Sequence, residues 1–249
     1  MMKVLGIIPA RFASTRFPGK PLVDIDGKTM IQRVWEQAGK SALDELVVAT
    51  DNTEIYNHVV AFGGQACMTK ESHVSGTDRC YEALELLAKR FDYVINIQGD
   101  EPFIDPEQIN LLIGVLDGKT EIATLIKSIT NPETLFNPNI VKVVTATTGD
   151  ALYFSRATVP YLRNTPKEDW LSSYTFYKHI GMYAYRCDIL EAITKLPVAS
   201  LETAESLEQL RWLTHGYKIK VVETNIETIG IDAPADIERA LRAHSQREP

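Results

Sequence analysis

Short apolar runs of strand length alternate with longer helical segments along the first 116 residues of the chain. The predicted strands cover residues 4–8, 46–49, 65–68 and 93–97, and the predicted helices cover residues 30–38, 53–62, 77–90 and 105–116. This alternation is typical of a parallel sheet with helices on both faces, because every parallel strand needs a crossover connection. The sequence therefore predicts a doubly wound α/β fold in which helices lie on either side of a mostly parallel sheet.

The second half of the chain has a different pattern, with more strand signals. Residues 141–146 and 151–155 flank Thr147-Thr148-Gly149-Asp150, a combination typical of a β-hairpin. An irregular aromatic stretch follows at residues 160–178. After it, the pattern predicts strands at 181–186 and 219–223 and helices at 188–195, at 203–215 and from Pro234 onward.

Neither a repeat nor a linker divides the chain. We therefore expect a single domain over residues 1–249, with a β-rich insertion at about residues 127–186. The apolar and aromatic composition of this insertion suits a subunit interface and hence a homodimer. A solvent-facing lid would have a similar composition.

Charge and cysteine content narrow the range of partners and compartments. The chain has 26 Lys and Arg against 33 Asp and Glu, a net charge of −7, which argues against a broad nucleic-acid-binding surface. Its apolar runs, such as residues 111–116, are far shorter than the roughly 20 residues that span a bilayer. The three cysteines, Cys67, Cys80 and Cys187, are scattered, as is typical of reduced thiols. We expect a cytoplasmic protein with neither a membrane nor a nucleic acid as partner.

A basic loop at residues 9–21 follows the first predicted strand, where open parallel sheets bind their ligands. Residues 1–23 contain four cations, Lys3, Arg11, Arg16 and Lys20, and no acid. Small residues in the loop let backbone N–H groups approach a ligand, and clustered cations neutralise a polyphosphate. Neither Gly-x-x-x-x-Gly-Lys-Ser/Thr nor Gly-x-Gly-x-x-Gly is present. The loop therefore predicts a phosphate site of another kind, with a solvated basic turn as the alternative.

An acidic turn, Gln98-Gly99-Asp100-Glu101-Pro102, follows the predicted strand at residues 93–97. Carboxylates at a strand end suit Mg²⁺, which proteins hold through one or two carboxylates together with substrate phosphates. The alternative is a turn whose acids are only solvated.

A third motif, residues 73–79 (His-Val-Ser-Gly-Thr-Asp-Arg), precedes a predicted helix. Ser75, Gly76 and Thr77 could offer N–H groups and hydroxyls to an anion or to the edge of a base at the helix N-terminus. Plain capping of the helix by Ser75 or Thr77 is the alternative.

Further short motifs follow in order along nearly the whole chain. They are residues 9–20 (Pro-Ala-Arg-x-x-Ser-x-Arg-x-Pro-Gly-Lys), 49–51, 68–69, 73–79, 98–102, 136–139, 141–144, 151–156, 179–181, 185–186, 207–211 and 230–232. In this combination the sequence resembles the 3-deoxy-manno-octulosonate (Kdo) cytidylyltransferases. The first motif alone would also admit other sugar nucleotidyltransferases, including those for sialic acids, whereas the later motifs are more specific.

The resemblance implies in-line attack of the anomeric hydroxyl of Kdo on the α-phosphorus of CTP, which gives CMP-Kdo for lipopolysaccharide assembly and releases diphosphate. It also implies catalytic roles for Lys20, Asp100 and Arg16, and Mg²⁺ held by Asp100 and Asp232. The implied nucleotide-binding residues are Ala10, Arg11, Arg16, Lys20, Ser75, Gly76, Thr77, Arg79 and Gln98. The candidate sugar-binding residues are Gln98, Arg156, His179, Tyr183, Glu205 and Gln209.

For the metal-binding and the sugar-binding residues, the sequence also predicts which side chains lie close together. Asp232 follows a strand-like segment at residues 219–229, so we expect it at the same sheet edge as Asp100. Glu205 and Gln209 are four residues apart within the predicted helix 203–215, so we expect them on one helix face.

Other readings of the sequence predict different observations. A cytidylyltransferase for 8-amino-Kdo or a sialic acid would be separated by substrate competition. A catalytically silent nucleotide-binding module would be expected to lack Lys20, Asp100 or Asp232, and all three are present. A glycosyltransferase would be expected to have Asp-x-Asp near the central strand, where the chain has Asp100-Glu101-Pro102.

Overall fold

The computed structural model describes residues 2–13 and 17–245, which fall into two compact units. The first unit comprises Met1–Gly114 together with Ile226–Pro249, and the second comprises Val115–Asn225. The second unit therefore extends beyond the predicted insertion of residues 127–186 at both ends. Within the described residues no helix is long and apolar enough to cross a membrane.

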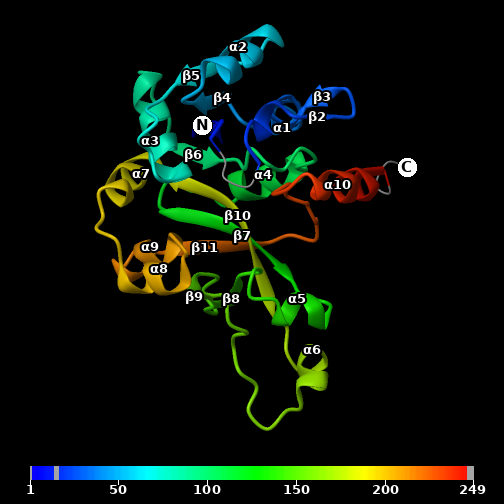
Figure 1. The fold of residues 1–249 in the computed structure, drawn as a ribbon. Coiled ribbons are helices and arrows are strands. Elements are labelled where there is room, and N and C mark those ends of the chain that lie inside the picture. The colour runs from blue at the N-terminus through cyan, green and yellow to red at the C-terminus, as the bar shows by residue number, and fades with distance from the viewer. Residues whose placement is uncertain (1, 14–16, 246–249) are drawn as a thin grey trace. The chain divides into compact units, whose positions relative to one another are not determined.

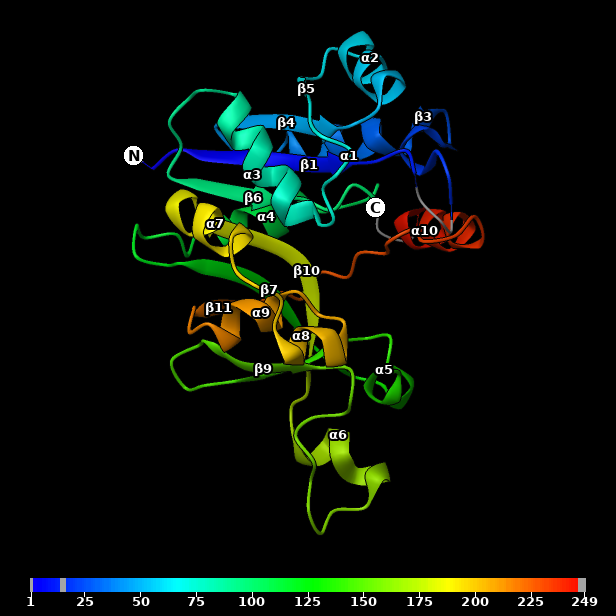
Figure 2. The same cartoon turned by 60° about the vertical axis from the view of Figure 1, so that its left-hand side comes forward.

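The first unit is built on a four-stranded parallel sheet in the order β6-β1-β4-β5 (Figure 1 and Figure 2). Its strands are β1 (Val4–Ala10), β4 (Glu45–Thr50), β5 (Ala66–Met68) and β6 (Tyr93–Asn96). Helix α3 (Gly76–Leu86) covers one face of β1 and β6, while α1 (Met30–Ala38) and α4 (Pro106–Ile113) contact each other on the opposite face (Figure 2). Strand β1 is buried almost throughout because both faces are covered. The predicted α/β architecture is confirmed.

The remaining elements of this unit lie around the sheet. They are the 3₁₀ turn η1 (Lys20–Leu22), the hairpin of β2 (Asp24–Ile25) and β3 (Lys28–Thr29), helix α2 (Thr53–Ala61) and helix α10 (Ala235–Ser245). The N-caps Thr29, Asn52, Ser75 and Asp105 each accept a hydrogen bond from a backbone N–H of the first helical turn. These side chains fix where α1, α2, α3 and α4 begin.

Two predicted helices of the first unit end early. Helix α3 stops at Leu86 instead of residue 90, because Ala88 has a φ of 49°, which no helix continues. Helix α4 stops at Ile113 instead of residue 116, with Gly114 as its C-cap. The apolar spacing in the sequence continues past the C-terminal ends of both helices, so it did not predict the residues at which they end.

The second unit contains β7 (Ile122–Ser128), β8 (Lys142–Thr145), β9 (Ala151–Ser155), β10 (Tyr177–Arg186) and β11 (Ile219–Glu223). Strand β10 runs antiparallel to β7 and β8, β11 runs parallel to β7, and β8 and β9 form an antiparallel pair. The predicted hairpin is thus confirmed. Strand β7 was not predicted, and β10 begins four residues before its predicted start.

The short helices of this unit are α5 (Pro132–Phe136), η2 (Lys167–Asp169), α6 (Trp170–Ser173), α7 (Cys187–Thr194), α8 (Ser200–Glu205) and α9 (Gln209–Thr214). The single helix predicted over residues 203–215 is wrong. Ser206 has a φ of 51°, a left-handed conformation that separates α8 from α9. The aromatic stretch around α6 folds over its own small core of Ile129, Leu135, Trp170 and Phe176.

Candidate active site

Lys20 and two aspartates meet at one point of the first unit. The Nζ atom of Lys20 lies 2.8 Å from Oδ2 of Asp100 and 3.8 Å from Oδ1 of Asp232. It also donates a hydrogen bond to the carbonyl of Ile231 at 2.9 Å. The Lys20 ammonium group therefore contacts one aspartate that lies 80 positions after it in the sequence and another that lies 212 positions after it. This confirms the expected proximity of Asp100 and Asp232.

Asp232 reaches this point by a different route from the one expected. Strand β11 ends at Glu223, and Asp232 lies in the irregular segment that returns to the first unit. This segment is attached to the acidic turn by two hydrogen bonds. The Ile231 N–H donates to the Asp100 carbonyl at 2.9 Å, and the Thr228 hydroxyl donates to Oε2 of Glu101 at 2.7 Å. Hydrogen bonding, not strand pairing, brings the two aspartates together.

Glu101 is a partly buried carboxyl beside this point. Burial raises its pKa from 4.5 to about 7, and the nearby Asp100 and Glu227 also raise it, while the bond from Thr228 acts in the opposite direction. A carboxyl group so close to the predicted metal ligands is thus protonated over much of the acidic range.

The turn at the start of α3 lies against the end of β1. A Cβ atom on Gly76 would lie 3.6 Å from Cγ of Pro9, and one on Gly99 would lie only 2.8 Å from the Pro9 carbonyl oxygen. Gly99 is therefore required by close backbone approach. These contacts bring Ala10, the Ser75-Gly76-Thr77 turn and the acidic turn around the carboxyl end of β1, where open parallel sheets bind ligands.

The alternative prediction, that Ser75 caps helix α3, is confirmed. The Ser75 hydroxyl accepts a hydrogen bond from the Asp78 N–H at 3.1 Å. The loop that precedes this turn is held by the Glu82 carboxylate of α3. Glu82 Oε2 accepts from the Lys70 N–H at 2.7 Å and lies 2.5 Å from Nε2 of His73. Neither His73 nor Glu82 was predicted as a site residue, although His73 belongs to the same motif.

Arg79 has an internal position. Its side chain is 4% exposed and donates to Asp51 at 2.6 Å and to the Thr69 hydroxyl at 2.5 Å. These bonds connect the segments that follow β4 and β5. The geometry thus gives Arg79 a role in holding those segments, and the nucleotide contact predicted for it stays a prediction.

The other residues predicted around the nucleotide differ in position. Ala10 is buried at the end of β1, Arg11 is exposed directly after it, and Gln98 is partly buried at the start of the acidic turn. Arg16 lies outside the described residues. Gly19, with a φ of 69°, donates its N–H to the Phe12 carbonyl and so closes the loop directly before Lys20.

The described residues fit Mg²⁺ bound together with a substrate. No group of three or more His, Cys, Asp or Glu residues within the described chain could hold a metal by itself. Asp100 and Asp232 instead offer two carboxylates around a common point, with side chains 32% and 55% exposed. Mg²⁺ binds in this manner when waters and phosphate oxygens complete its coordination.

In the second unit, the side chains of Arg156 and Glu205 each bind the backbone of the other residue. Glu205 accepts from the Ser155 hydroxyl at 2.7 Å and from the Arg156 N–H at 2.9 Å, and these bonds hold the pKa of its carboxyl below the usual value against the effect of burial. The Arg156 guanidinium donates through Nε to the Glu205 carbonyl at 2.7 Å. The carboxylate predicted to contact the sugar is therefore engaged in fixing Arg156.

His179 and Tyr183 lie on β10 on either side of a register shift. The Thr124 hydroxyl contacts Nε2 of His179 at 3.0 Å and donates to the carbonyls of Ile180 and Met182 at 3.2 and 2.8 Å. Burial lowers the pKa of His179 to about 3 and raises that of Tyr183 well above its usual value. Both side chains are thus neutral at physiological pH. Thr124, which lies in the strand that was not predicted, contacts the His179 ring and the backbone between His179 and Tyr183.

Gln209 is buried at the first position of α9, whereas Glu205 ends α8. The expected common helix face does not exist, because the left-handed Ser206 separates the two helices.

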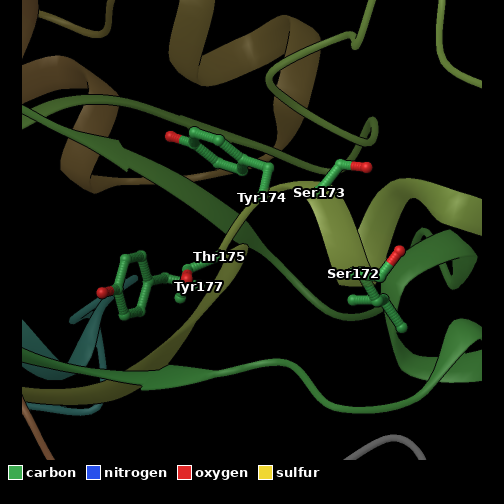
Figure 3. A pocket seen from close by; sticks show the side chains of 6 residues that line it. Ser172, Ser173, Tyr174, Thr175 and Tyr177 are labelled. Atoms are coloured by element: carbon green, nitrogen blue, oxygen red, sulfur yellow. The ribbon is translucent and has the colours of Figure 1, made fainter.

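A cavity of about 420 Å³ lies along α6 and the residues after it (Figure 3). Its lining consists of Leu171, Ser172, Ser173, Tyr174, Thr175 and Tyr177. None of the predicted site residues belongs to this set, so the cavity gives no support to any predicted role.

Comparison with known proteins identifies relatives over the full length. A family model described as cytidylyltransferase matches residues 5–220. A 3-deoxy-manno-octulosonate cytidylyltransferase of Parabacteroides distasonis is 58% identical over 246 residues, which cover 97% of this chain and 98% of that protein. The solved structure of a CMP:2-keto-3-deoxy-manno-octonic acid synthetase complexed with CTP matches with a TM-score of 0.91 and 42% identity, covering 99% of this chain and 100% of that one.

A more distant solved structure shares only the fold. It is a 4-diphosphocytidyl-2C-methyl-D-erythritol synthase of Anaerococcus prevotii, with a TM-score of 0.64 and 16% identity over 99% of both chains.

Proposed function

The chain belongs to the 3-deoxy-manno-octulosonate (Kdo) cytidylyltransferase family, and on this basis we propose that it transfers CMP from CTP to the anomeric hydroxyl of Kdo. The hydroxyl oxygen attacks the α-phosphorus in line, the bond to the bridging oxygen of the β-phosphate breaks, and diphosphate leaves. The product CMP-Kdo is the activated sugar for lipopolysaccharide assembly.

The observation that carries the proposed mechanism is the Lys20 ammonium beside Asp100 and Asp232. Phosphoryl transfer requires positioning and charge neutralisation more than covalent chemistry from the protein. Lys20 supplies positive charge for the leaving diphosphate, and Arg11 and Arg16 extend that charge along the loop. The Ser75-Gly76-Thr77 turn and Ala10 offer backbone groups to the cytosine.

Asp100 and Asp232 are the residues that would hold Mg²⁺. When bound, Mg²⁺ would neutralise phosphate charge and lower the pKa of the attacking hydroxyl. Without a substrate, Lys20 keeps the two carboxylates close to one point and compensates their charge.

The acidic sugar needs a cation for its carboxylate, and Arg156 is the proposed one. Its guanidinium donates to the carbonyls of Glu205, Pro138 and Ser206, which are neutral acceptors, so its N–H groups are not bound to a carboxylate at these contacts. His179 stays neutral and in contact with Thr124, so it suits a hydrogen bond to the sugar and not the removal of a proton at neutral pH.

We further propose that the protein is a cytoplasmic homodimer. Its three cysteines are free thiols, which supports a reducing compartment. The exposed Tyr161 and Tyr174 around α6 support an interface in the second unit.

Diphosphate release tests the reaction. CTP and Mg²⁺ are supplied with Kdo, with 8-amino-Kdo or with a sialic acid, and ATP, GTP and UTP replace CTP in parallel. Release should require CTP together with Kdo. Release with CTP and only another acidic sugar would contradict the assigned sugar, and no release with any pair would favour a silent nucleotide-binding module.

A substitution tests the role of Lys20. Lys20→Ala should lower kcat by about 100-fold or more, in the range found when one charge-stabilising donor is removed. Lys28→Ala is the matched control, because Lys28 lies in the same unit but pairs on the surface with Glu36. Equal kcat values for the two variants would show that Lys20 has no part in the reaction.

A further inference from the structure

Lys142, on β8, is a fully buried cation whose hydrogen bonds within the described residues go to backbone carbonyls and not to a carboxylate. Its side chain is 0% exposed, and Nζ donates to three backbone carbonyls, those of Asn137 at 2.9 Å, Ile140 at 2.5 Å and Arg156 at 2.7 Å. Lysine is rarely buried completely unless it is paired, since the charged form loses its hydration. Burial accordingly lowers its pKa. An apolar side chain would fill the same space at lower cost, so packing alone does not account for a lysine here.

The three carbonyls belong to two segments that must be held together. Asn137 and Ile140 form a turn after α5, in which the Ile140 N–H donates to the Asn137 carbonyl at 3.1 Å. Pro138, in the same turn, offers its carbonyl to the guanidinium of Arg156 at 3.4 Å. The turn at residues 137–140 therefore contacts both cations, and Lys142 binds the backbone of this turn and of Arg156.

The guanidinium that this arrangement supports donates its hydrogen bonds within the described residues to backbone carbonyls, while the Glu205 carboxylate interacts with its charge without accepting a hydrogen bond from it. Glu205 is the carboxylate in contact with Arg156, but its oxygens are taken by the Ser155 hydroxyl and the Arg156 N–H. The guanidinium itself donates to neutral carbonyls, and the two contacts through its terminal nitrogens are long, at 3.4 Å. A guanidinium that is held in place and whose N–H groups donate only to neutral carbonyls is suited to donate to an anionic group of a ligand.

We propose that Lys142 is a positioning residue for Arg156, which it holds, through the turn at residues 137–140 and the Arg156 backbone, where the guanidinium receives the carboxylate of the acidic sugar. This inference rests on the proposed function, since it requires a sugar substrate with a carboxylate. It gives a role to two sequence motifs that the proposed reaction otherwise leaves without one, at residues 136–139 and 141–144, and connects them with the motif at residues 151–156 that contains Arg156.

The test compares Lys142→Met, which keeps the side-chain length but donates no hydrogen bond, with wild type. KM for Kdo should rise about 10-fold or more, in line with the loss of hydrogen bonds to a charged group, and KM for CTP should change by less than about 2-fold. Val143→Ala is the matched control. Val143 neighbours Lys142 on β8 and is equally buried, so its truncation loosens the same strand without removing the ammonium. It should leave KM for Kdo within about 2-fold of wild type.

A double-variant cycle separates positioning from general damage. If Lys142 acts through Arg156, the double variant of Lys142→Met and Arg156→Ala should have nearly the same KM for Kdo as Arg156→Ala alone. Multiplicative effects, or equal rises in KM for both substrates, would overturn the inference. If Lys142→Met does not fold, Lys142→Gln, which keeps two amide donors, takes its place with a smaller rise in KM expected.

Different results would overturn the proposed function and the role of Lys142. A wild-type protein that forms no CMP-Kdo overturns the proposed function and the inference together. Active wild type with an unchanged KM for Kdo in both Lys142 variants overturns the inference alone.

Discussion

Replacement of Glu101 by Gln should stabilise the protein at alkaline pH and leave it unchanged at acidic pH. Glutamine has the same shape, and its amide oxygen can still accept the hydrogen bond from Thr228. The carboxyl of Glu101 has a pKa of about 7 in the folded protein against 4.5 when solvated. Between these values the unfolded chain releases a proton that the folded protein retains, so the free energy of unfolding falls as pH rises.

The magnitude follows from the difference between the two pKa values. At about 1.36 kcal/mol per pH unit, this difference corresponds to a loss of about 3 kcal/mol between pH 4.5 and pH 7, with no further loss above. Glu101→Gln removes the ionisation and hence the loss. The variant should therefore equal wild type near pH 4 and exceed its free energy of unfolding by about 3 kcal/mol at pH 8.

Urea unfolding followed by circular dichroism, in EDTA and at several pH values between 4 and 8, measures this difference. Glu107→Gln removes the same charge from an exposed position on α4 and is the matched control, with an expected effect below about 0.5 kcal/mol at every pH. A difference between Glu101→Gln and wild type that is independent of pH would contradict a raised pKa of Glu101 in the folded protein, as would a destabilised variant at pH 8.

Two further predictions concern buried charges and buried histidine. Arg79→Met should lower the free energy of unfolding by about 3–5 kcal/mol, because it leaves the carboxylate of Asp51, 12% exposed, without its partner. Urea unfolding measures this, and a loss below about 1 kcal/mol would show that the pair is not buried in solution. The ring of His179, whose pKa is lowered to about 3, should show no titration in NMR spectra between pH 8 and pH 5, and a midpoint near 6.5 would contradict its burial. Because the unfolded chain gains a proton at His179 below about pH 6.5, this residue should also make the protein less stable as pH falls.

Much of the first unit could be predicted from local sequence signals. Helix α1 was predicted with its observed ends, since its apolar spacing coincides with an N-cap at Thr29 and a glycine after Ala38. Strands β1 and β6 were recognisable as short apolar runs followed by loops with cations and acids. Helix caps and apolar spacing depend only on residues a few positions apart in the sequence, so the sequence alone is enough to recognise them.

The second unit was predicted less well because its elements depend on distant contacts. Strand β7 pairs with residues of β10 that lie 49 to 63 positions later, and a short apolar run does not by itself distinguish a buried strand from a helix. The break between α8 and α9 depends on the left-handed conformation of Ser206. Serine rarely adopts this conformation, so the residue type did not predict the break.

The succession of strands and helices in the first unit, and the charged residues at its strand ends, could be predicted from the sequence because periodicity and capping are local properties. Which of the charged residues meet depends on the folded chain. Folding brought Asp232 to Lys20 and Asp100, engaged Glu205 with Ser155 and Arg156, and placed Lys142 among three carbonyls. The physical reason is that the charge, partner and burial of such groups depend on contacts between distant parts of the chain. These contacts exist only when the chain is folded.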